Sequence, residues 1–158
     1  MSDMTFSSKG VEIPEICTKC GGKCCKNYPG GATPEDFEAP DEKLMYDKIL
    51  MALKSGRWTI DWEGTGDDKI YFIRPAIKGN EGSIFDHAYE GECTFLTSSG
   101  CELNLGERPE ACRMLIPKIT ERCDNQGYTR KRIAFRWKQY QELILNCAVE
   151  AEGLEYLV

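Results

Sequence analysis

The sequence predicts a small single-domain α+β protein with cysteine-rich metal-binding loops, a β-hairpin and two main helices. Three observations support this fold class: nine cysteines among 158 residues fall mainly into two groups, a stretch of alternating apolar residues is followed by a turn, and apolar residues recur at helical spacing on both sides of that stretch. A chain of this length buries roughly 68–70% of its unfolded surface, so the thiols are not needed to staple a small fold. We expect residues 1–13 to form a flexible N-terminal arm and residues 14–158 to form one cysteine-cluster metal-binding domain.

The first main helix is predicted to begin at 40–42, where Pro40 is followed by two acids, and to end near Gly56. Its apolar residues recur at helical spacing: Leu44, Met45, Ile49 and Leu53. Another helix start is predicted at 33–36, with Thr33 as its capping residue. The acids between 35 and 42 are therefore interpreted as helix-start charges rather than as a catalytic pair.

A β-hairpin is predicted next. Trp58, Ile60 and Trp62 alternate with polar residues, residues 64–68 are rich in Gly and Asp, and residues 69–74 supply the return strand. A second, short hairpin is predicted with 93–96 and 101–103 as its arms, and it carries one thiol on each arm. A short helix is expected over 107–115.

The C-terminal part is predicted to hold a short strand at 128–133 and then a helix that runs to about Ala151. One face of that helix is apolar: Trp137, Tyr140, Ile144, Ala148 and Ala151. Gly153 is expected to cap the helix. The preceding basic run could contact an anion or a protein, but a solvated face is the favoured interpretation: Arg130, Lys131, Arg132, Arg136 and Lys138.

Composition limits the compartment and the partners. The first ten residues hold no apolar segment typical of a signal peptide, and no later segment approaches the length of a transmembrane helix. We therefore expect a cytoplasmic protein, in which thiols stay reduced and cysteine clusters favour metal over disulfides. The net charge of −6 argues against nucleic-acid and anionic-membrane binding, which leaves metal ions and a protein as the candidate partners.

The first cysteine group places four thiols within nine residues: Cys17, Cys20, Cys24 and Cys25. A C-x2-C turn presents two thiolates to one ion or to one edge of a cluster. Cys24 and Cys25 are adjacent, so their side chains diverge in extended backbone and are not expected to bind the same mononuclear ion. This pair favours a polynuclear cluster or more than one metal over a single tetrahedral zinc. A thiol–disulfide relay is the weaker alternative, since no βαβ pattern surrounds the motif.

The second group is Cys93, Cys101 and Cys112. Cys112 lies on the predicted short helix between Arg108 and Arg113, which we expect to act at the cofactor by offsetting thiolate charge and by donating hydrogen bonds to sulfur.

Three further residues carry side chains that can bind a metal. Cys147 lies on the apolar side of the last helix and is interpreted as a core residue. Cys123 is either a ligand or an exposed loop thiol. His87, the only histidine, could be a ligand, but a loop histidine bound to water is favoured.

Both cysteine segments resemble the CxxCxxCC family, which is described as a zinc- or iron-chelating domain. The first match is the run from Cys17 to Cys25, although three residues rather than two separate Cys20 from Cys24. The second match comprises Cys93-Thr-Phe-Leu, Gly100-Cys101-Glu-Leu and Glu107-Arg108-Pro109-Glu110-Ala111-Cys112-Arg113. The resemblance implies these metal ligands: Cys17, Cys20, Cys24, Cys25, Cys93, Cys101 and Cys112, with Cys123 as an eighth. Eight thiols would complete two sites of four thiolates, whereas seven would require a bridge, a water or His87.

Three functions follow from these observations. The first is a binding or electron-transfer protein that holds an iron–sulfur cluster, because thiolate ligation and adjacent cysteines suit a polynuclear centre. The second is a zinc-stabilised interaction domain. The third is an enzyme similar to flagellin lysine methylases, to which the family resemblance extends and which use an iron–sulfur centre. No acid–base constellation in the sequence supports the enzyme, and we assign no catalytic residue.

Overall fold

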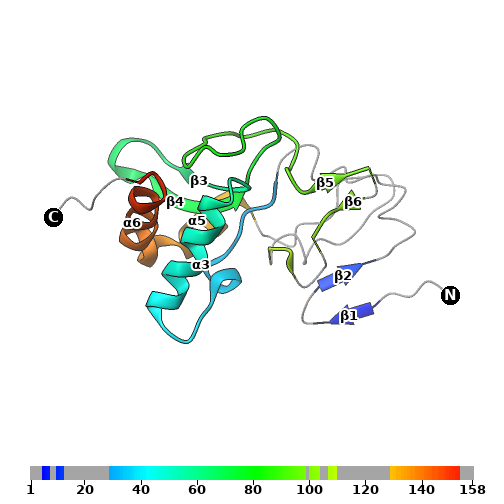
Figure 1. The fold of residues 1–158 in the computed structure, drawn as a ribbon, viewed down its shortest axis with the longest axis horizontal. Helices are drawn as coiled ribbons and strands as arrows, with labels where there is room; N and C mark the ends of the chain where they lie inside the picture. Colours follow the sequence, from blue (N-terminus) through cyan, green and yellow to red (C-terminus); the bar gives the residue numbers. More distant parts are fainter. Residues whose placement is uncertain are drawn as a thin grey trace.

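The computed structural model describes residues 29–98, 101–103, 107–109 and 129–153, together with the backbone of β1 (Thr5–Ser7), β2 (Gly10–Glu12) and Gly100. In the described part of the chain, α-helices pack against an antiparallel hairpin, which confirms a small α+β fold (Figure 1). Strands β1 and β2 pair with each other in antiparallel register within the segment expected to be an arm.

Helix α3 (Glu42–Lys54) confirms the first predicted helix. The side chain of Asp41 accepts a hydrogen bond of 2.8 Å from the Leu44 amide and so caps the first turn. The helix buries Met45, Ile49 and Leu53, whereas Leu44 is 46% exposed. The preceding turn is a short 3-10 helix, η1 (Pro34–Phe37), in which the Asp36 carboxylate accepts from the Thr33 amide at 2.8 Å. The acids at these two starts therefore cap helices, as the sequence predicted.

The cap of α3 gives a local stability prediction. Asp41→Ala is expected to lower the free energy of unfolding by about 1 kcal/mol, because the Leu44 amide loses its acceptor. Asp41→Asn keeps an acceptor oxygen and should change stability by only a few tenths of that amount. Urea denaturation of both variants measures the difference. Equal losses in the two variants would show that the cap hydrogen bond is not the cause.

Strands β3 (Trp58–Glu63) and β4 (Ile70–Pro75) form the predicted hairpin, with Trp58 opposite Pro75 and Glu63 opposite Ile70. The turn requires glycine at position 64. Gly64 has a φ of 89°, and a Cβ there would lie 2.5 Å from the Asp68 carbonyl oxygen. A short 3-10 turn, η2 (Gly66–Asp68), leads into β4.

Both edges of this hairpin are bonded to other segments. On the β4 side, the Ala32 amide donates to the Ile73 carbonyl at 2.8 Å, and the Gln141 side chain accepts from the Tyr71 amide at 2.7 Å. On the β3 side, the Ile60 amide donates to the Ile84 carbonyl at 2.8 Å, and Phe85 forms a parallel β-bridge with Ile60. Loop residues 84–86 are thereby fixed against the strand.

The C-terminal part differs from the prediction at its start. Residues predicted as a strand at 128–133 instead lead into helix α5 (Arg130–Arg136), which is followed by η4 (Lys138–Tyr140) and α6 (Gln141–Ala151). The predicted strand is wrong because Thr129 caps a helix, and because Ile133 and Ala134 of that helix are buried against the hairpin. The single long helix expected up to Ala151 is likewise interrupted at η4. Gly153, with a φ of 77°, follows the C-terminus of α6 as predicted.

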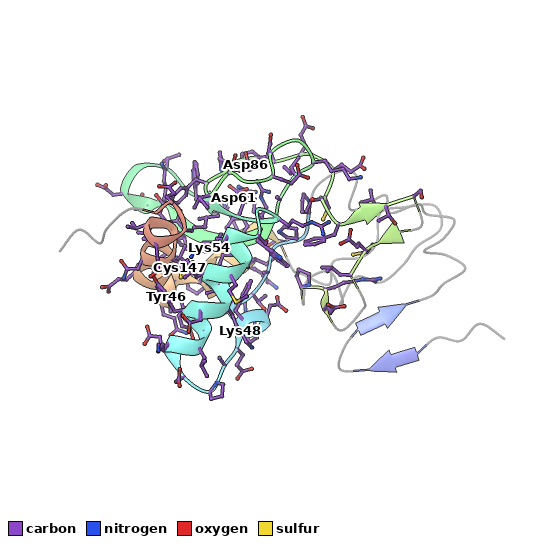
Figure 2. The ribbon with its side chains drawn as sticks, viewed as in Figure 1. Tyr46, Lys48, Lys54, Asp61, Asp86 and Cys147 are labelled. Carbon is purple, nitrogen blue, oxygen red and sulfur yellow. The ribbon has the colours of Figure 1, made fainter. Side chains whose placement is uncertain are left out.

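The core lies between α3, α6 and the hairpin, and Trp137 is completely buried in it (Figure 1). Its indole N–H donates to the Ala32 carbonyl at 2.8 Å, and its ring contacts Phe37 at a centroid distance of 6.0 Å. Figure 2 shows Cys147 of α6 beside Tyr46 of α3, and the Cys147 thiol lies 3.5 Å from the Tyr46 carbonyl oxygen. The core assignment of Cys147 is confirmed, since its exposed fraction is 0%. None of the helices that the structure describes has the length and apolar character needed to cross a membrane.

Candidate functional site

Two of the eight predicted thiol ligands lie within the described residues, and both belong to the short hairpin. Strands β5 (Leu96–Thr97) and β6 (Gly100–Cys101) form that hairpin, with Cys101 opposite Leu96. Of the other predicted site residues, Arg108 is described, and the rest lie outside the described residues: Cys17, Cys20, Cys24, Cys25, Cys112, Arg113 and Cys123.

Backbone hydrogen bonds hold Cys93 against the body of the protein. Cys93 is bridged to Ile77, which lies just beyond β4, and the neighbouring Thr94 amide donates to the Ala76 carbonyl at 2.9 Å. The Cys93 carbonyl in turn accepts from the Leu96 amide at 3.0 Å, which closes the turn that leads into β5. The prediction of a hairpin that carries Cys93 and Cys101 is therefore confirmed, although Cys93 precedes the first strand rather than lying in it.

The two thiols lie in different environments. Cys93 is buried, with 5% of its surface exposed, whereas Cys101 is partly exposed. The pKa of the Cys93 thiol is raised to about 11, mainly by burial and also by the neighbouring Cys101, while Arg57 and Lys78 act in the opposite direction. At neutral pH this thiol therefore keeps its proton unless a bound cation replaces it.

Arg57 is the cation beside this hairpin that sequence reasoning missed. Its guanidinium forms a two-point ion pair with Glu102, at 2.5 Å and 3.1 Å, and also donates to the Thr94 carbonyl at 3.1 Å. It lies 4.2 Å from the centroid of the Phe95 ring. Arg57 thus ties both arms of the hairpin to the start of β3 and supplies positive charge near the thiols. No spacing rule connects position 57 with the cysteine motif, so only the fold reveals this contact.

Arg108 was predicted to act at the cofactor. Its Nε donates to the Leu103 carbonyl at 3.0 Å, so the side chain also braces the segment that leaves the hairpin. Arg108 and Pro109 line a cavity of about 430 Å³ together with Phe37, Lys48 and Trp58. The Arg-Pro motif therefore shares this cavity with residues of η1, α3 and β3.

The described hairpin supplies only part of a metal site. Across the residues with a described position, no three His, Cys, Asp or Glu side chains are grouped so that they could hold a metal ion. Cys93 and Cys101 nevertheless fit a sulfur-preferring metal by their chemistry, since both are free thiols and the Arg57 guanidinium acts on Cys93. A complete centre needs further ligands, and the cysteines outside the described residues are the candidates.

His87 does not lie with this hairpin. It is an exposed loop histidine, as the favoured interpretation expects, but its ring also contacts neighbouring side chains. Its ring stacks on Trp62 at a centroid distance of 4.4 Å, and its Nδ1 lies 2.8 Å from the Asp61 carboxylate. Because a carboxylate only accepts, the imidazole donates the Nδ1 proton to Asp61. These contacts lie toward the β3–β4 turn, whereas Cys93 is anchored beyond the opposite end of β4.

The contacts of His87 belong to a buried ionic network that the sequence did not indicate. We call it the Asp61 network, and its members are Asp61, Glu63, Arg74, Asp86, His87 and Arg130. Asp61 and Arg74 have no exposed side-chain surface, and their charged atoms are 2.8 Å apart. Arg74 reaches Asp86 at 2.9 Å, and Arg130 reaches Asp61 at 2.7 Å. Figure 2 shows Asp61 and Asp86 near each other at the hairpin.

Arg130 departs from the prediction of a solvated basic face. Only 15% of its side chain is exposed, and it also forms an ion pair with Glu63. Its guanidinium donates to the carbonyls of Trp62 and Ala88, each at 2.8 Å. Arg130 therefore joins α5 to β3 and to the loop that follows residue 84.

Burial of Asp61 by itself would raise its carboxyl pKa, but hydrogen bonds from Arg130 and Arg74 outweigh burial and lower the pKa below its ordinary value. The carboxylate is therefore charged at neutral pH. Every charged member of the network faces an opposite charge. We therefore interpret the network as a structural clamp that joins the hairpin, the loop and α5.

Comparison of the chain with protein-family models, curated proteins and solved structures gave no match. The residues of this chain and their geometry are therefore the basis on which a function can be assigned.

Proposed function

We propose that this chain is a metal-binding protein that holds an iron–sulfur cluster, or iron or zinc ions, through two groups of cysteine thiolates. The observation that carries the proposal is the seating of Cys93 and Cys101 on one short hairpin that backbone bonds and Arg57 fix against the body. In the proposal, the thiols of the first group complete the centre: Cys17, Cys20, Cys24 and Cys25, with Cys112 and Cys123.

The environment of the hairpin supports thiolate ligation in particular. A buried thiol that retains its proton is a poor nucleophile, which argues against a relay based on Cys93. A metal ion would replace the proton and neutralise the thiolate, and Arg57 would offset the remaining negative charge. This chemistry requires a reducing compartment, so the proposal includes a cytoplasmic location.

An iron–sulfur cluster is the favoured cargo, because the adjacent Cys24 and Cys25 suit a polynuclear centre better than one tetrahedral ion. The alternative is a zinc-stabilised protein-interaction domain, for which four thiolates per ion would suffice.

Anaerobic purification of the untagged chain separates the two. We expect brown protein that contains iron and acid-labile sulfide and whose visible absorption bands bleach with dithionite. Oxygen is strictly excluded and iron is supplied during expression. Colourless protein with stoichiometric zinc under these conditions would support the zinc alternative and contradict the cluster. Parallel aerobic purification is the control for cluster loss, since zinc can occupy thiols that have lost iron.

A further inference from the structure

Five aromatic rings follow one another from loop 84–90 across the hairpin, and none of them belongs to the proposed metal centre. We call Phe85, Tyr71, Trp62, His87 and Tyr89 the aromatic row. Successive ring centroids along it are 5.9, 6.0, 4.4 and 5.1 Å apart. The two ends of the row reach solvent, since Phe85 is 38% exposed and Tyr89 is 67% exposed.

The row is held in place by the fold. Trp62 and Tyr71 are opposite each other in the β3–β4 register, and Phe85 is bridged to Ile60 of β3. Asp61 fixes the imidazole of His87 through Nδ1. A preformed aromatic surface of this kind loses little conformational entropy when it binds a partner.

The rings of the row already accept cations. The ammonium of Lys69 lies 4.9 Å from the Trp62 ring centroid, and the guanidinium of Arg130 lies 4.5 Å from that of Tyr89. Such contacts use the negative face of the ring. Tyr89 keeps 67% of its surface exposed beside Arg130, so its ring has surface that a further lysine or arginine side chain can contact.

Lys69 and Arg130 are the cations that contact the rings, and three exposed carboxylates near the row in the sequence favour a basic partner. Asp67 and Asp68 lie in the turn next to Trp62, and Glu90 follows Tyr89; all three are exposed, and no ion pair with another described residue is found for them. The whole chain carries a net charge of −6. Single-stranded nucleic acid also stacks on aromatic rings, but it requires a positively charged groove, and these carboxylates oppose it.

We propose that the aromatic row docks a lysine- or arginine-rich segment of a protein partner, with Tyr89 and Phe85 contacting the aliphatic stems and cationic heads and with Glu90, Asp67 and Asp68 supplying the opposite charge. This inference is independent of which metal the cysteines hold.

A fluorescently labelled heptalysine peptide, titrated with the full-length metal-loaded chain at low salt, tests the docking surface by anisotropy. Tyr89→Ala should weaken binding about two- to fivefold, which is the usual range for an exposed cation–π contact, whereas Tyr89→Phe keeps the ring and should retain the affinity. Glu90→Gln should also weaken binding and should reduce its salt dependence. Circular dichroism checks that each variant is folded. If Tyr89→Ala does not fold, Glu90→Gln still tests the proposal.

Phe135→Ala is the matched control. Phe135 lies on α5, is 63% exposed and has the Lys138 ammonium 5.5 Å from its ring, but it is not part of the row. Its replacement should leave heptalysine affinity unchanged. Equal weakening by Phe135→Ala, absence of heptalysine binding, or tighter binding of an oligothymidylate than of the peptide would each overturn the proposal.

Discussion

Replacing Asp61 with alanine is expected to lower the free energy of unfolding by about 3–5 kcal/mol, the cost typical of removing one partner from a buried ion pair. Arg74 has no exposed side-chain surface and faces Asp61 at 2.8 Å, so the variant leaves a buried guanidinium without that carboxylate. His87 and Arg130 also lose an acceptor, at 2.8 Å and 2.7 Å respectively. The loss should be observed as a lower midpoint in urea denaturation of the purified chain.

The matched control for this variant is an ion pair at the surface. Glu92→Gln breaks the exposed pair with Lys78, whose charged atoms are 2.6 Å apart, and should cost about 0–1 kcal/mol. An Asp61→Ala variant as stable as Glu92→Gln would show that the Asp61 network does not clamp the hairpin, the loop and α5.

The contribution of the Asp61 carboxylate to the free energy of unfolding is expected to depend on pH. The folded protein lowers the pKa of Asp61 below its ordinary value of 3.8, so the unfolded chain takes up the proton first as the pH falls. The contribution of the charged carboxylate is therefore fully present above about pH 4 and is lost as the pH falls through the lower pKa of the folded state. The difference in unfolding free energy between wild type and Asp61→Asn should shrink in acid. A difference that grows below this pH would contradict the assigned direction.

Cys101→Ser is expected to produce the second large effect, the loss of cooperative thermal unfolding together with loss of metal. Bound metal contributes free energy of folding that the apo chain lacks, and serine does not replace a thiolate as a ligand for iron or zinc. Differential scanning calorimetry should show a broad or absent transition in this variant. Cys20→Ser should behave in the same way, because the proposal assigns Cys20 to the same centre. A sharp transition at the wild-type temperature in Cys101→Ser would remove Cys101 from the ligand set.

The parts of the fold that were predictable are those whose signals are local. Asp41 and Gly56 mark the ends of α3, and the glycine- and aspartate-rich turn between alternating apolar residues defines the β3–β4 hairpin. Helix α5 was missed because its residues resemble a short strand when considered alone. Burial of Ile133 and Ala134 against the hairpin favours a helix over a strand here. That contact joins parts of the chain that are far apart in the sequence.

The candidate site was likewise predictable only where its signals are local in the sequence. The turn residues at 97–100, between 93–96 and 101–103, predicted the hairpin that carries Cys93 and Cys101. Arg57 beside that hairpin was not predicted, and neither was the pairing of Asp61 with Arg74, because charged residues in a strand ordinarily face solvent. Only the strand register and the burial identify these charges as partners.

The most direct test of thiolate metal binding is the metal content per chain of wild type, Cys101→Ser and Cys147→Ala, all purified anaerobically in one batch. Cys147 is a completely buried core thiol, and its removal tests the effect of losing a cysteine without losing a proposed ligand. We predict full metal content in wild type and Cys147→Ala and a large loss in Cys101→Ser. The proposed centre would be contradicted if wild-type protein contained no iron or zinc. It would also be contradicted if Cys101→Ser kept its metal while Cys147→Ala lost it.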